Sequence, residues 1–82
     1  MIKVTIRSGP DAGRVTQVSG DAFSIGRART CEVILTDRAV SRGHCRIERR
    51  GDSWIVIDGG SANGTFVNDR ESRISADYRL AP

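Results

Sequence analysis

The sequence predicts an all-β domain in the form of a two-sheet antiparallel β-sandwich. Short runs of alternating or β-branched apolar residues recur along the chain, separated by clusters of glycine, proline, aspartate and serine. No window of a dozen residues shows apolar residues at helical spacing between capping residues. Strands at this spacing are typical of a sandwich or a barrel. Because 82 residues leave no room for a second domain, we expect residues 1–82 to form a single one.

The first half of the chain predicts a series of short strands. Residues 1–7 alternate in polarity and place Ile2, Val4 and Ile6 on one face, which is the pattern of a half-buried strand. The turn residues of segment 8–13 then reverse the chain. Further strand-like runs follow at residues 14–18, 22–25 and 32–35.

A hairpin is predicted in the second half of the chain. Residues 44–49 place Cys45 and Ile47 on one face, and the pair Gly51-Asp52 then makes a tight turn into the run 53–58. The hairpin is therefore expected to join two adjacent antiparallel strands.

Two expectations concern the strands that follow this turn. Residues 54–57 are apolar at every position, which predicts a central strand covered on both faces. Phe66 and Val67 are expected to form the last short strand, after the glycine-rich loop 59–64.

Composition limits the classes of function. Thirteen basic and ten acidic residues leave a net charge of +3, which is too mild to require nucleic acid or a membrane as partner. No apolar run approaches the ~20 residues of a membrane span. Cys31 and Cys45 make no disulfide framework, and no cysteine or histidine spacing resembles a zinc site. We expect both cysteines to be buried or half-buried in a reducing cytoplasm.

The basic residues are almost all arginines, since Lys3 is the single lysine. The planar guanidinium group binds phosphate and carboxylate bidentately, but a preference for arginine codons explains the composition equally well. The positions of the arginines along the chain therefore have to distinguish between these two explanations. Arginines and small polar residues gather in three loops at strand ends, at residues 26–30, 41–44 and 61–65. Loops at one end of a sandwich converge and commonly form its binding surface.

These loops resemble the signature of the forkhead-associated (FHA) domain. The matching residues, in order along the chain, are Gly26-Arg27, Ser41, His44, Asp58, Asn63-Gly64 and Asn68. The turn at residues 8–10 also resembles that of many bacterial members. The resemblance covers nearly the whole chain and implies a module that recognises phosphothreonine peptides in signalling, without catalysis, metal or cofactor.

The resemblance implies four ligand-binding residues. Arg27 would give the phosphate a charge-assisted donor, and Arg42 a second positive charge. Ser41 would offer its hydroxyl, and its turn would aim backbone N–H groups at phosphate oxygens. Asn63 would bind the main chain of the peptide, since an amide side chain can both donate and accept.

Four further residues are expected to support these loops: Gly26, His44, Gly64 and Asn68. The glycines would serve turns with positive φ or a close backbone approach. His44 beside Ser41 is also compatible with a nucleophile and its base, but no aspartate orients the pair and no oxyanion hole is evident. We therefore expect no enzyme activity. Asp58 is expected to brace a loop.

The end of the chain departs from the family pattern. That pattern usually continues past Pro82 with Gly-Asp and two further strands that pair with the first strand. We therefore expect the C-terminal strands to be missing and the edges around residues 1–7 and 66–71 to be open. Open edges invite pairing with another chain, which predicts a dimer or a strand swap.

Two other classes of function stay open at this stage. A phosphate-independent assembly domain would use the same loops to pack against a folded partner, although the intact phosphate-binding set favours a phosphothreonine reader. A nucleic-acid binder of sandwich or barrel type would use the arginines, but four scattered aromatic residues offer little for bases to stack on. We expect neither nucleic acid nor a membrane as partner.

Overall fold

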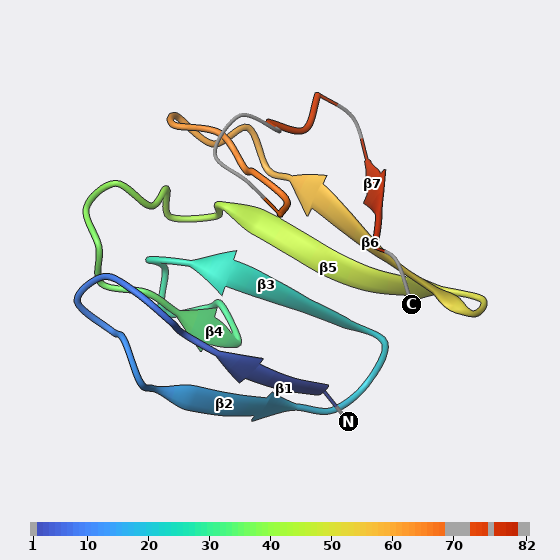
Figure 1. The fold of residues 1–82 in the computed structure, drawn as a ribbon, viewed down its shortest axis with the longest axis horizontal. Coiled ribbons are helices and arrows are strands. Elements are labelled where there is room, and N and C mark those ends of the chain that lie inside the picture. The colour runs from blue at the N-terminus through green and yellow to red at the C-terminus, as the bar shows by residue number, and fades with distance from the viewer. Residues whose placement is uncertain (1, 69–72, 76, 81–82) are drawn as a thin grey trace.

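The computed structural model describes residues 2–68, 73–75 and 77–80. Its elements are all strands: β1 (Ile2–Thr5), β2 (Val15–Val18), β3 (Ala22–Gly26), β4 (Val33–Ile34), β5 (Cys45–Arg50), β6 (Ser53–Asp58) and β7 (Tyr78–Arg79). They form a two-stranded sheet, β1-β2, and a five-stranded sheet in the order β4-β3-β5-β6-β7 (Figure 1). The prediction of an all-β, two-sheet fold is therefore confirmed.

One pair of strands runs against the antiparallel expectation. β4 lies parallel to β3, with Ile25 opposite Val33 and Gly26 opposite Ile34. The other neighbours are antiparallel. A strand of two residues is too short to show alternation, so its direction depends on the tertiary contact and not on a local pattern.

The predicted hairpin between β5 and β6 is confirmed. Arg50 is opposite Ser53, which leaves a two-residue turn of Gly51 and Asp52. Gly51 has a φ of 62°, a conformation that glycine adopts without steric cost. A positive φ at the first turn position matches the twist of the two strands and so fixes their register.

The core lies between the two sheets. Phe23 and Val33 are 2% and 1% exposed, and Val18 of β2 packs with them. Ile2 and Val4, on the inner face of β1, close the core from the other sheet. Burying an aromatic or branched side chain contributes about 1.5–3 kcal/mol, so this cluster anchors β3, the strand that leads into the first loop.

Both cysteines lie where the sequence predicts. Cys31 is buried, Cys45 is half-buried, and both are free thiols. Burial raises the pKa of Cys45 to about 11, with smaller contributions from Asp58 and Cys31. Cys45 is therefore a protonated, unreactive thiol at neutral pH.

Two strand expectations are wrong in part. Strand β6 is central, between β5 and β7, but only Val56 is buried in it. Ile55 and Ile57 are on the opposite face and stay partly exposed, because side chains alternate and the β1-β2 sheet covers one face only. Phe66 makes a single bridge to Arg73 and does not form a strand with Val67.

Strand β7, which lies at one edge of the five-stranded sheet, is not predicted by the sequence. Within the described ranges, β1 pairs with β2 alone, and β7 pairs with β6 alone. Part of the other predicted open edge, residues 69–71, lies outside the described residues. The predicted dimer or strand swap stays a prediction.

Candidate functional site

The three polar loops lie together at one end of the sandwich, on the left of Figure 1. The amide of Arg27 donates to the carbonyl of Ser41 at 3.2 Å, and the amide of Ala28 to that of Arg42 at 3.1 Å. The third loop joins them where the amide of Ala62 donates to Ser41 Oγ at 2.9 Å. Hydrogen bonds from the main chain therefore hold the loops in one arrangement.

Gly26 makes the closest of these approaches possible. A Cβ at this position would overlap the carbonyl oxygen of Arg42, and would lie 2.9 Å from its carbonyl carbon and 3.0 Å from the amide nitrogen of His44. Only a residue without a side chain fits there. The first and second loops can thus be bonded to one another along their backbones.

The imidazole of His44 bridges the second and third loops. Its Nδ1 accepts from the amide of Ser41 at 3.0 Å, and its Nε2 is 2.8 Å from the carbonyl oxygen of Gly64. Because the Ser41 amide can only donate, Nδ1 carries no proton and Nε2–H donates to Gly64. The expected turn N–H of Ser41 is therefore already used, and neither ring nitrogen faces a nucleophile.

We expect His44→Ala to loosen this end of the domain. The substitution leaves the amide of Ser41 and the buried carbonyl of Gly64 without partners, which costs about 1–3 kcal/mol. Urea unfolding should show the loss as a lower midpoint with an unchanged slope. Phe66→Ala, at an exposed position, is the control with little expected effect. A wild-type midpoint for His44→Ala would contradict the bridging role.

The side chains of Arg27 and Arg42 are both exposed. Arg27 Nε donates to the carbonyl of Val40, which fixes its guanidinium against the residue that precedes the second loop. Neither its two terminal nitrogens nor the guanidinium of Arg42 bonds to a described residue. These groups are free to donate to an oxyanion.

Ser41 and Asn63 each keep one hydrogen-bonding function free. Ser41 Oγ accepts from Ala62, so its hydroxyl proton remains available. Asn63 Nδ2 donates to the carbonyl of Ala39 at 2.8 Å, which holds the amide against the segment that leads into the second loop. Within the part of the chain that is described, its Oδ1 accepts no hydrogen bond and can take one from a ligand.

Asp58, at the end of β6, organises the third loop. Its Oδ2 accepts from the amides of Gly60 and Ser61 at 3.1 and 3.0 Å, and its Oδ1 from the hydroxyls of Ser61 and Thr65. Burial opposes ionisation here, but these hydrogen bonds outweigh it and lower the pKa of Asp58 to about 2. The expected brace is present, and its partners Ser61 and Thr65 were not foreseen.

This carboxylate predicts a stability that falls in acid. The pKa of Asp58 is about 2 when folded and ordinarily 3.8, so the unfolded chain binds the proton first. The contribution of the Asp58 carboxylate to the free energy of unfolding is complete above about pH 4 and is lost as the pH falls towards about 2. Urea unfolding across that range should show a steeper decline for the wild type than for Asp58→Asn. Equal declines would contradict the prediction, since Asp11 and Glu48, whose pKa values are also lowered, are common to both proteins.

Three residues of segment 59–68, which follows β6, have a left-handed backbone. Gly60 has a φ of 78°, Gly64 a φ of 86° and Asn68 a φ of 73°. Asparagine tolerates this conformation better than most residues with a side chain. All three help to curve the segment that carries Asn63.

Sequence reasoning missed a contact that holds Thr36, which lies between β4 and the second loop. Asp11, in the first turn, accepts from the amide of Thr36 at 2.7 Å and from its hydroxyl at 3.0 Å. The hydrogen bond from the Thr36 amide lowers the pKa of Asp11. The partners are 25 residues apart, and no local pattern links them.

Comparison with known proteins places this geometry in a family. A family model described as the cytoplasmic domain of an inner membrane component of T3SS, an FHA-like domain, matches residues 5–82. The oxoglutarate dehydrogenase inhibitor of Corynebacterium jeikeium (strain K411) is 37% identical over 73 residues, which are 89% of this chain and 50% of that protein. A structure from a study of phosphothreonine-dependent FHA domain interactions has a TM-score of 0.80 at 30% identity, over 96% of this chain and 77% of its own. The chain belongs to the FHA domain family.

A second FHA structure agrees with this assignment. The FHA domain of FhaA, solved in complex with the intracellular domain of another protein, has a TM-score of 0.73 at 32% identity, over 88% of this chain and 76% of that one. The FHA resemblance and the sandwich fold are thus confirmed. The chain spans about half the length of the curated relatives it matches.

Two kinds of feature are not found among the described residues of this FHA domain. Among them, no group of three or more histidine, cysteine, aspartate or glutamate side chains is arranged to hold a metal ion. Nor do they include a helix of the length and apolar character needed to cross a membrane.

Proposed function

We propose that this FHA domain binds phosphothreonine-containing segments of partner proteins and does so without catalysis. The observation that carries the proposal is the meeting of Arg27, Ser41, Arg42 and Asn63 at one end of the sandwich. Each of them has a donor or acceptor that the described residues leave unused.

Arg27 and Arg42 supply the positive charge that a phosphate dianion requires. Charge-assisted hydrogen bonds contribute about 1.5–3 kcal/mol each, so two or three of them make binding conditional on phosphorylation. Because Arg27 is already held at Val40, little of its side-chain entropy remains to be lost on binding. The hydroxyl of Ser41 adds a neutral donor.

Asn63 acts on the peptide main chain beside the phosphothreonine. Its Nδ2 is bound to Ala39, so its free Oδ1 is an acceptor for a peptide N–H. This contact is independent of the peptide's side chains and sets the register of the bound segment. Specificity for the phosphorylated residue then comes from the arginines and Ser41.

We further propose that residues 1–82 are one module of a regulatory protein that works in the cytoplasm. The relatives named as an oxoglutarate dehydrogenase inhibitor and a glycogen accumulation regulator support a regulatory setting. In such a setting, the domain would bring its phosphorylated partner into a complex.

Titration with a degenerate phosphothreonine peptide library tests the proposal. Phosphoserine and unphosphorylated libraries of the same design are the controls. Binding restricted to the phosphothreonine library supports it. Equal binding of phosphorylated and unphosphorylated peptides would instead favour an assembly domain, and a steep salt dependence with nucleic acid alone would favour a nucleic-acid binder.

A further inference from the structure

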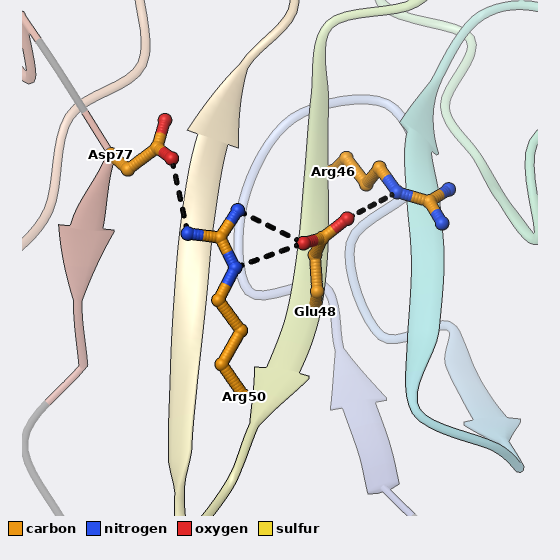
Figure 2. A network of polar contacts seen from close by, with 4 residues as sticks. All are labelled: Arg46, Glu48, Arg50 and Asp77. Carbon is orange, nitrogen blue, oxygen red and sulfur yellow. Dashed lines mark hydrogen bonds and ion pairs between the residues drawn. The ribbon is translucent and has the colours of Figure 1, made fainter.

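Many arginines outside the loops are paired with carboxylates. Figure 2 shows one network on the five-stranded sheet, in which Glu48 accepts from Arg46 and Arg50, and Arg50 also contacts Asp77 at 3.4 Å. Hydrogen bonds from these two arginines lower the pKa of Glu48. The remaining ion pairs among the described residues are Arg14 with Asp11 and Arg49 with Asp21.

The four arginines of residues 26–44 differ from these. Arg27, Arg29, Arg38 and Arg42 are all exposed, and none of them pairs with a carboxylate of a described residue. Residues 26–44 contain these four arginines and two carboxylates, Glu32 and Asp37, so four minus two leaves a charge of +2. Most of the net charge of +3 is thus concentrated around the proposed phosphate site.

Two of these arginines occupy the corners of closed turns. The amide of Cys31 donates to the carbonyl of Ala28 at 3.1 Å, which places Arg29 at the second position of a turn. The amide of Val40 donates to the carbonyl of Asp37 at 3.0 Å, which does the same for Arg38. Asp37 is occupied within its own turn, where its side chain accepts from the amide of Ala39.

Both turns are bonded to residues of the proposed phosphate site. Ala28 begins the turn that carries Arg29, and its amide is bonded to Arg42. Ala39 follows Arg38, and its carbonyl holds Asn63, the residue proposed to bind the peptide main chain. The carbonyl of Val40, which closes the same turn, accepts from Arg27 Nε. The turn of Arg29 is thus bonded to one arginine of the site, and the turn of Arg38 to the other arginine and to Asn63.

We propose that the partner segment carries acidic residues next to its phosphothreonine, with aspartate or glutamate side chains facing Arg29 and Arg38. This inference rests on the proposed function. An exposed ion pair strengthens binding by about 1.4- to fivefold, so two pairs give a gain of about two- to 25-fold. The gain is largest at low salt, because ions in solution screen exposed charges.

Three phosphothreonine peptides with acidic, neutral and basic flanks test the inference. Titrations at about 50 and 300 mM salt should rank them acidic, neutral, basic, with differences that shrink at the higher salt. Arg29→Glu and Arg38→Glu should each bring the ratio of acidic to neutral affinity towards one. Arg79→Glu, at an exposed position of β7, makes the same charge change away from the loops and should preserve that ratio.

The outcomes separate the two proposals. Equal affinity for acidic and neutral peptides at low salt would overturn the acidic preference and leave phosphothreonine recognition standing. The same loss of preference in Arg79→Glu as in the loop variants would overturn it too, because the effect would then reflect net charge. If no phosphothreonine peptide binds, both proposals are wrong.

Discussion

Replacing Arg27 with alanine is expected to weaken the binding of a phosphothreonine peptide by about 100-fold or more, with little change in stability. The guanidinium would make at least two charge-assisted hydrogen bonds to the phosphate, and the loss of both costs about 3 kcal/mol or more. Its bond within the domain, to the carbonyl of Val40, is at an exposed position. Isothermal titration calorimetry measures the first effect and urea unfolding the second.

Two further variants make this result specific. Arg27→Lys keeps the charge but not the planar fork, so it should recover only part of the affinity. Arg46→Ala removes an arginine whose Nε is bound to Glu48 on the sheet, and it should bind like the wild type (Figure 2). Wild-type affinity in Arg27→Ala would remove the main support for a phosphate site in these loops.

The fold could be predicted from the sequence where the local pattern was long enough to carry a signal. The alternation of residues 2–6 and the Gly51 turn each specify a strand or a register by themselves. Strands β4 and β7 have two residues each, and their positions depend on the neighbours with which they pair. Phe66 has the β-propensity of a strand residue but makes only one bridge, because propensity does not create a partner.

The site could be predicted as a set of side chains but not as a set of free hydrogen-bonding groups. The turn N–H of Ser41, expected to face the phosphate, is bound to His44. Asn63 and Arg27 are held by the backbone carbonyls of Ala39 and Val40. Because every residue has such a carbonyl, the sequence does not indicate which one accepts the hydrogen bond. Which donors remain for a ligand is therefore visible only after the loops have been brought together.

Gly26→Ala is the substitution that should affect stability most. Its Cβ would overlap the carbonyl of Arg42, which is backbone and cannot rotate away. Either the end of β3 or the second loop must move, and the bonds of Arg27 to Ser41 and of Ala28 to Arg42 would lengthen or break. We expect a loss of about 3 kcal/mol or more in the free energy of unfolding, measured with urea.

Gly43→Ala is the matched control for this prediction, because a Cβ there would meet no atom within 4 Å. That variant should stay within about 0.5 kcal/mol of the wild type. Gly26→Ala should also lose peptide affinity, since the same movement separates Arg27 from Ser41. Stability and affinity thus fall together at Gly26, whereas Arg27→Ala lowers affinity alone. If both glycine variants unfolded at the same urea concentration, the close contact of the first and second loops could not be what holds the site.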